Sequence, residues 1–178
     1  AQIVAQTDAS VILVPTPSSE ETDEFELDYV YECLKVICDA IIEKISYHLV
    51  VISSTVMPGA HKELIEFLET ETGLTCGEDF GFIYNPEFVA LGNVVKDFLE
   101  PSFVLIGESD SIAGNTWYSF LRPIFEPSVK LMRTSLINAE VVKLAVNVAV
   151  TMKVTYANTL AVLCDNIPGA NVDDVTEL

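Results

Sequence analysis

The chain alternates between short continuous apolar runs and segments in which apolar residues recur every three or four positions. The continuous runs are rich in β-branched residues and end at turn residues, which is typical of strands in a parallel sheet. Pro15 and Pro17 stop the first run, and both this run and the second suit strands that are buried on both faces. The predicted strands cover residues 10–15, 49–54, 80–84 and 103–107, and a further extended piece covers 129–132.

The segments between these runs have the periodicity of helices. In the clearest case the apolar residues share one face of a helix, and they are Val30, Leu34, Ile37 and Ile41. The predicted helices cover residues 28–45, a segment that opens at 55–59 and reaches 71, residues 112–125, and residues 138–165. Strands that alternate with helices are joined by right-handed crossovers, so the first ~130 residues predict an α/β fold with a parallel sheet.

The helix expected at 138–165 differs from the others because it is apolar around most of its circumference. We expect it to be buried on several sides, within a small helical domain or against a partner subunit. A membrane span is disfavoured because Lys143, Asn147, Lys153 and Asn158 interrupt the apolar stretch.

Charge narrows the choice of partners. The 178 residues include 9 Lys and Arg against 27 Asp and Glu, for a net charge of -18. An acidic surface repels phosphate backbones and anionic lipid heads, so we expect neither nucleic acid nor a membrane as a partner. A salt-loving source is one explanation for the excess of acids.

The cysteines and histidines suggest no metal site. Cys33, Cys38, Cys76 and Cys164 form no CxxC pair, and only two histidines could join them. We therefore expect reduced cysteines, no bound metal and a cytoplasmic protein. Cys33 and Cys38 are interpreted as helix-packing residues, and His48 and His61 as ordinary surface or edge residues. The first ten residues lack the features of a signal peptide and do not begin with Met, which suggests an internal or trimmed fragment.

Three loops at strand ends carry the candidate chemistry. Ligands of open parallel sheets bind outside the carboxyl ends of the strands, so the residues that follow each strand matter most. These loops are Val14–Pro17, Ser53–Val56 and Asn85–Phe88. No G-x-G-x-x-G fingerprint occurs, so we expect the phosphate-binding turn of a dinucleotide fold to lie upstream of residue 1.

The motifs of these loops resemble those of the UDP-glucose/GDP-mannose dehydrogenase family. That family's pattern runs V-P-T-P, S-T-V-x-P-G, N-P-E-F-L-x-E-G, D-F-x-x-P-x-x-x-x-I-G and A-E-x-x-K-x-x-x-N. The corresponding segments occur here in the same order, at residues 14–17, 54–59, 85–92, 97–107 and 139–147. The resemblance implies the second half of a Rossmann-like parallel sheet, as the C-terminal part of an NAD-binding domain (1–132). The long helix of an all-α central dimerisation domain (133–178) would follow it.

The resemblance also implies the site for NAD. Pro15, Thr16, Ser54 and Thr55 match the cofactor-binding segment, and Thr55 also matches a residue that orders water near the reacting carbon. A hydroxyl at a strand end can donate to a nicotinamide or pyrophosphate oxygen without adding charge. The alternative is that the two threonines only cap the loop or the next helix.

The remaining candidates concern the nucleotide-sugar substrate. Glu87 matches an acid/base, and Phe88 and Val89 match residues that hold the sugar nucleotide largely through main-chain groups; a solvated loop acid is the alternative for Glu87. Lys143 and Asn147 lie four residues apart on one helical face and match the pair that steadies an oxyanion.

Two departures from the family pattern stand out. Leu91 replaces the usual second glutamate of the N-P-E-F-L-x-E-G loop, and the G-G-x-C motif of the nucleophilic cysteine has no counterpart before Leu178. Cys164 lies at the end of the long helix without a glycine-rich setting, so we interpret it as a core thiol.

The resemblance implies part of an NAD-dependent nucleotide-sugar 6-dehydrogenase that oxidises the C6 hydroxyl of a UDP- or GDP-sugar to a uronic acid in two hydride transfers. The fragment alone is expected to be inactive and to form a homodimer through helix 138–165. UDP-glucose, GDP-mannose and an N-acetylated sugar stay open as substrates, with N-P-E-F favouring the first two. The alternatives are a non-catalytic dimerisation module and a β-hydroxyacid dehydrogenase, against which the N-P-E-F and V-P-T-P loops count.

Overall fold

A computed structural model describes residues 2–22, 24–89 and 92–177. The chain forms two compact units, residues 1–141 and 142–178. The first unit holds the sheet, and the second holds most of the long helix α5 (Leu136–Asp165) and the short helix α6 (Val172–Thr176). Leu91, which replaces the usual second glutamate of the family pattern, lies outside the described residues.

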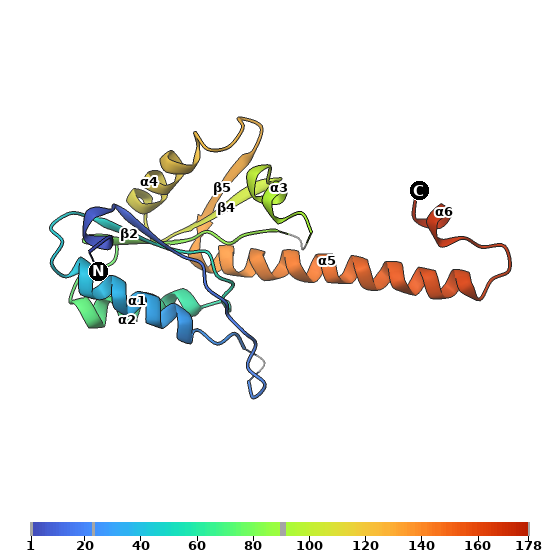
Figure 1. The fold of residues 1–178 in the computed structure, drawn as a ribbon, viewed down its shortest axis with the longest axis horizontal. Coiled ribbons are helices and arrows are strands. Elements are labelled where there is room, and N and C mark those ends of the chain that lie inside the picture. The colour runs from blue at the N-terminus through green and yellow to red at the C-terminus, as the bar shows by residue number, and fades with distance from the viewer. Residues whose placement is uncertain (1, 23, 90–91, 178) are drawn as a thin grey trace. The chain divides into compact units, whose positions relative to one another are not determined.

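The first unit is built on one five-stranded sheet with the order β1-β2-β3-β4-β5 (Figure 1). The strands are β1 (Ala9–Ile12), β2 (His48–Ile52), β3 (Phe80–Tyr84), β4 (Phe103–Glu108) and β5 (Lys130–Ser135). All neighbours are parallel except β3 and β4. The predicted α/β class is therefore confirmed, with a sheet that is parallel at every pair but one.

The antiparallel pair of β3 and β4 corrects the prediction of a fully parallel sheet. Tyr84 pairs with Gly107 in the antiparallel register. The helix between the two strands, α3 (Val94–Leu99), has only 6 residues, and the rings of Phe88 and Phe103 lie 4.8 Å apart. The start of β4 is thus held beside the loop that follows β3, whereas a parallel return needs a crossover that recrosses the sheet.

Helices cover both faces of the sheet. Helices α1 (Asp28–Ile41) and α2 (Ala60–Thr72) lie on one face, and α4 (Ser111–Leu121) lies on the other (Figure 1). Tyr31 of α1 packs edge-on against Phe67 of α2. The core under α4 consists of buried side chains from β2, β3, β4 and α4, namely Leu49, Val51, Ile83, Val104, Ile106, Ala113, Trp117 and Leu121. A short 3-10 helix, Val4–Gln6, together with α3 and α6, was not predicted from periodicity because each is too short to show it.

Strand β1 is less buried than the sequence predicts. It lies at the edge of the sheet, where Val11 is 54% exposed. The strand is present, but the expectation that it is buried on both faces is wrong. Its partner β2 and the next strand β3 are buried throughout.

His48 is a core residue, and its assignment to the surface was wrong. It is 1% exposed at the start of β2. Its Nε2 atom lies 2.9 Å from Ser10 Oγ, and its Nδ1 atom lies 2.9 Å from Lys44 Nζ. Burial, and then the nearby ammonium of Lys44, lower the pKa of His48 from 6.5 to about 4.

A close approach between β4 and the first turn of α5 places that turn against the sheet. A Cβ atom on Gly107 would lie 2.6 Å from Ala139 Cβ and 3.2 Å from Leu136 Cα. Only glycine allows this distance, which explains the glycine in the D-F-x-x-P-x-x-x-x-I-G segment.

The long helix α5 has 30 residues and confirms the helix predicted at 138–165. In the second unit many of its large apolar side chains are exposed, including Met152 (67%) and Tyr156 (65%). Cys164 is buried, as expected of a core thiol. Within the described residues no helix combines the length and the apolar character needed to cross a membrane.

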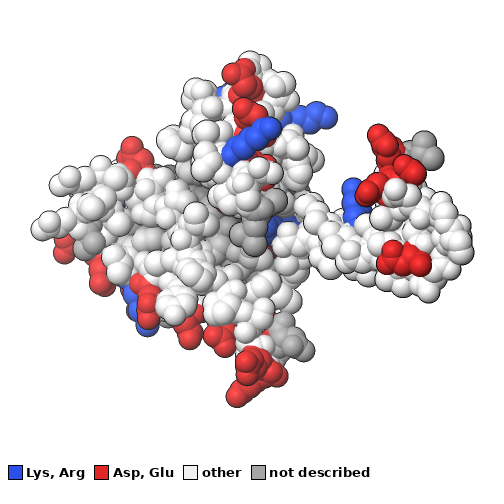
Figure 2. Space-filling model, turned by 45° about the vertical axis from the view of Figure 1, so that its right-hand side comes forward, with Lys and Arg blue, Asp and Glu red and all other residues white. Residues whose placement is uncertain are grey.

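The surface is acidic, in line with the composition. The face seen in Figure 2 carries more acidic than basic side chains. Acidic side chains appear on several separate parts of this face.

Candidate active site

The loops that follow β1 and β2 are joined by side-chain hydrogen bonds. The hydroxyl of Ser54 accepts a hydrogen bond from the Val14 N–H (2.8 Å) and donates one to the Val14 carbonyl (2.7 Å). The Thr16 hydroxyl donates to the Thr55 carbonyl over 2.8 Å. Because β1 and β2 are parallel, their carboxyl ends lie at the same edge of the sheet, and these bonds fix the two loops as one piece.

In this pair of loops, the hydroxyl of Thr55 is available for binding a ligand. Its side chain is half-buried, and no described residue forms a hydrogen bond with its hydroxyl. Pro15 is exposed beside it along the first loop, whereas Ser54 is buried. The Thr55 hydroxyl is uncharged, and such a group can donate to a nicotinamide or pyrophosphate oxygen.

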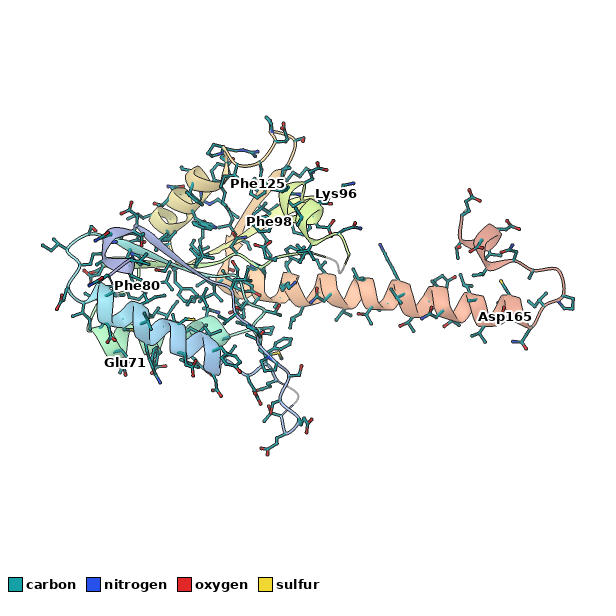
Figure 3. The ribbon with its side chains drawn as sticks, viewed as in Figure 1. Glu71, Phe80, Lys96, Phe98, Phe125 and Asp165 are labelled. Atoms are coloured by element: carbon teal, nitrogen blue, oxygen red, sulfur yellow. The ribbon has the colours of Figure 1, made fainter. Side chains whose placement is uncertain are left out.

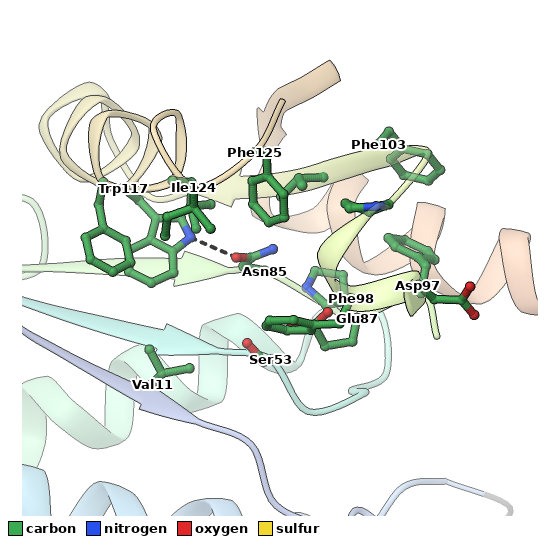
Figure 4. A pocket seen from close by; sticks show the side chains of 16 residues that line it. Val11, Ser53, Asn85, Glu87, Asp97, Phe98, Phe103, Trp117, Ile124 and Phe125 are labelled. Atoms are coloured by element: carbon green, nitrogen blue, oxygen red, sulfur yellow. Dashed lines mark hydrogen bonds between the residues drawn. The ribbon is translucent and has the colours of Figure 1, made fainter. Parts of the chain in front are cut away.

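The loop that follows β3 is held by Asn85. Its side chain is buried, accepts a hydrogen bond from Trp117 Nε1 (2.9 Å) and donates one to the Leu105 carbonyl (3.0 Å). Figure 4 shows the bond between the Trp117 indole and Asn85. Pro86 and Glu87 therefore leave the sheet from a fixed starting point.

Glu87 and Phe88 line a cavity of about 240 Å³ in the first unit. Its wall is largely aromatic and includes Phe98 of α3, Trp117 of α4 and Phe125. Phe98 and Phe125 lie on the same side of the sheet as α4 (Figure 3). The polar lining residues are Ser53, Asn85, Glu87 and Asp97 (Figure 4). The cavity thus presents few polar groups within an apolar wall, as small-molecule sites do.

A buried glutamate that sequence reasoning did not single out lies next to these loops. Glu140, in the second turn of α5, accepts hydrogen bonds from the Gly59 N–H (2.6 Å) and the His61 N–H (2.9 Å), and its Oε2 atom lies 2.9 Å from His61 Nδ1. His61 was predicted to be an ordinary surface or edge residue, which is wrong because its ring is held by this carboxylate. The signal was present in the A-E-x-x-K segment, where Glu140 precedes Lys143.

The sequence-predicted site residues fall into three groups. Pro15, Thr16, Ser54 and Thr55 come together at the ends of β1 and β2, and Glu87 and Phe88 line the cavity beside Ser53. Val89 is 40% exposed and is not among the cavity residues. Lys143 and Asn147 belong to the second unit and lie four residues apart on α5. In the described parts of the chain, no three His, Cys, Asp or Glu side chains are grouped so that they could hold a metal ion.

This fold and this edge of the sheet define an α/β domain of the nicotinamide-cofactor dehydrogenase class. Within that class, residues 1–129 match the UDP-glucose/GDP-mannose dehydrogenase family, NAD binding domain, and residues 137–178 match the central domain of the same family. The chain belongs to the UDP-glucose/GDP-mannose dehydrogenase family. This confirms the resemblance drawn from the motifs, and it confirms NAD as the cofactor of the family.

Individual relatives agree with the family assignment. The chain is 34% identical over 175 residues to the UDP-glucose 6-dehydrogenase of Rickettsia typhi, covering 96% of this chain and 37% of that protein. It is 36% identical over 160 residues to the GDP-mannose 6-dehydrogenase of Azotobacter vinelandii, covering 89% of this chain and 36% of that protein. A ternary complex of GDP-mannose dehydrogenase from Pseudomonas aeruginosa superimposes with a TM-score of 0.92 and 32% identity, over 99% of this chain and 39% of that one. The chain thus spans less than half the length of these relatives.

Proposed function

We propose that the protein containing this chain is an NAD-dependent nucleotide-sugar 6-dehydrogenase that oxidises the C6 hydroxyl of a UDP- or GDP-sugar to a uronic acid in two hydride transfers. Family membership and the activities named for the relatives support this proposal. The observation that carries it is the arrangement of three motif loops along neighbouring strands, with Thr16 bonded to the Thr55 backbone and Glu87 lining a cavity.

We assign cofactor binding to the loops after β1 and β2. Bound NAD supplies the hydride acceptor. Thr55 and the exposed Pro15 would contact it, because the Thr55 hydroxyl is half-buried and available. Ser54 and Thr16 would shape the site, since their hydroxyls already donate to backbone carbonyls of the neighbouring loop.

We assign substrate binding to the loop after β3. Oxidation of an alcohol removes a hydride from carbon and a proton from oxygen, and Glu87 is the acid/base group in this loop that can take the proton. Phe88 and Val89 would hold the sugar nucleotide largely through their main-chain groups. The Glu87 side chain is half-buried and lines a cavity whose wall is largely aromatic, so it is held beside the space that the sugar would occupy.

We assign oxyanion stabilisation to Lys143 and Asn147. Their spacing of four residues on α5 puts an ammonium and an amide donor on one face of the helix. Both groups favour the negative charge that develops on oxygen in the course of the reaction.

We also propose that the protein is a homodimer through helix 138–165. The exposed apolar side chains of α5 include Val148, Met152, Val154, Tyr156 and Val162. A helix with this many exposed apolar side chains is typical of a protein–protein contact.

The proposal is tested by assaying the whole protein with NAD and either UDP-glucose or GDP-mannose. We expect one of the two sugars to yield two NADH per sugar consumed. Glu87→Gln should lower kcat by about 10²- to 10⁴-fold, as expected for loss of a general acid/base. Glu66→Gln is the matched control, because Glu66 is an exposed residue of α2. Absence of NADH with both sugars, in a protein that still forms dimers, would favour a non-catalytic dimerisation module instead.

A further inference from the structure

Glu140 holds the N-terminus of α2 from a distant part of the chain. Its side chain is 1% exposed. Oε2 accepts the Gly59 N–H and lies near His61 Nδ1, and Oε1 accepts the His61 N–H, so both carboxylate oxygens are used. The backbone donors are 81 and 79 residues away in the sequence, so this is a tertiary contact.

Helix α2 needs such a contact because it has no side-chain cap of its own. The first N–H groups of a helix have no partner within the helix and usually meet a polar side chain at the cap position. The cap residue here is Gly59, with φ 102°, and it has no side chain. Glu140 supplies the missing acceptor, and its negative charge also favours the positive end of the helix dipole.

The contact fixes the far end of the loop that carries Thr55. At the near end, Ser54 is bonded to Val14, and the Thr55 carbonyl accepts from Thr16. At the far end, Gly59 is bonded to Glu140. Thr55 lies between these two attachments, so its position depends on both of them.

The same carboxylate lies close to the end of β3. Burial raises the pKa of the Tyr84 phenol, and the negative charge of Glu140 raises it further. Tyr84 is the last residue of β3 and directly precedes Asn85, so the charge of Glu140 acts on a side chain at the end of this strand.

We propose that Glu140 is a positioning residue for the dehydrogenase reaction: through the N-terminus of α2 it holds the 53–59 loop in the shape that presents Thr55 to the cofactor. The inference rests on the proposed function, because it takes Thr55 as a cofactor contact. A carboxylate suits this task because it is purely an acceptor. A glutamine would turn its NH₂ group towards one of the three donors.

The test uses the whole protein with Glu140→Gln, and with Asp110→Asn as the matched control. Asp110 caps α4 by accepting from the Ile112 and Ala113 N–H groups. Its Oδ2 atom lies 3.5 Å from the Tyr47 hydroxyl. Tyr47 precedes β2 whereas Thr55 follows it, so Asp110 lies near the opposite end of this strand from Thr55. Both variants weaken one helix start, but only Glu140→Gln disturbs the 53–59 loop.

Two measurements distinguish positioning from plain stabilisation. The first is amide hydrogen exchange of the cofactor-free protein, in which Glu140→Gln should speed exchange across residues 53–61 and Asp110→Asn should not. The second is a kinetic double-mutant cycle with Thr55→Ala. Glu140→Gln alone should lower kcat/KM for NAD by about tenfold to a hundredfold, as small misplacements do. In the Thr55→Ala background it should lower this value less than twofold further.

The outcomes separate the two proposals. If the wild-type protein oxidises neither sugar, the proposed function fails and the positioning role fails with it. If the wild type is active but Glu140→Gln behaves like Asp110→Asn, or its effect adds fully to that of Thr55→Ala, only the positioning role is overturned. Should Glu140→Gln not fold, His61→Ala removes the side-chain donor and keeps both backbone bonds, and it should show the same exchange and kinetic changes at smaller size.

Discussion

The hydrogen bond between Trp117 and Asn85 allows a quantitative prediction. Trp117→Phe removes the indole N–H that donates to Asn85 Oδ1 over 2.9 Å, and no other described residue donates to that oxygen. The two residues are 5% and 7% exposed, so water cannot readily take the place of the indole. A buried acceptor left without a partner costs about 1–3 kcal/mol.

The smaller ring adds a second cost. Trp117 stacks on Phe120 with ring centroids 5.0 Å apart, and phenylalanine leaves part of the indole volume empty. We expect Trp117→Phe to lower the free energy of unfolding by about 2–4 kcal/mol in total. That is a large share of the roughly 5–15 kcal/mol that stabilises an ordinary domain.

The assay is urea unfolding of the chain followed by circular dichroism, because Trp117 is the only tryptophan and its fluorescence is lost in the variant. Asn85→Leu and the double variant complete a cycle. We expect a coupling of about 1 kcal/mol or more between the two positions. Additive effects, or a Trp117→Phe variant within about 0.5 kcal/mol of the wild type, would show that the loop after β3 is not held by this bond.

Three further predictions concern the rest of the chain. Because the pKa of His48 is lowered to about 4 in the folded state, the unfolded state binds more protons between about pH 6.5 and 4. Stability should fall by up to about 3 kcal/mol as the pH falls through this window; a His48→Gln variant that loses stability in parallel with the wild type would contradict this. Gly107→Ala should cost about 1–3 kcal/mol by overpacking, and adding Ala139→Gly should recover part of the lost Tm if the 2.6 Å contact is the cause. Met152→Glu should shift the mass measured by sedimentation from that of two chains towards that of one. A wild-type protein that is already monomeric at tens of micromolar would contradict the dimer proposal.

The elements that could be predicted from the sequence are those with strong local patterns. Strand β3 matches its predicted bounds. The long helix could be predicted because its apolar stretch is too long for a strand. The direction of β4 could not be predicted, because it depends on where the connection through α3 runs. The roles of His48 and His61 could not be predicted either, since Ser10 and Glu140 lie 38 and 79 residues away from them in the sequence.

The candidate site shows the same division. The strand-end positions of Thr16, Thr55 and Glu87 follow from the motifs, because parallel strands bring their carboxyl ends to one edge. Which hydroxyl is available and which is used within the protein depends on tertiary partners. Ser54 was predicted as a cofactor contact, and the structure places its hydroxyl on Val14.

The motif residues of this family therefore divide into two kinds, and the division has an experimental consequence. In the first kind, the polar side-chain atoms form hydrogen bonds within the protein, as in Ser54, Asn85 and Glu140. Gly107 belongs to the same kind because it packs against the first turn of α5. Replacing a buried polar group that already has its hydrogen-bond partners lowers the stability of the folded protein. The hydroxyl of Thr55 has no partner among the described residues, so it contributes little to the stability of the folded protein. Substitutions of the first kind should thus lower the free energy of unfolding, whereas Thr55→Ala should leave it nearly unchanged and lower only the affinity for NAD.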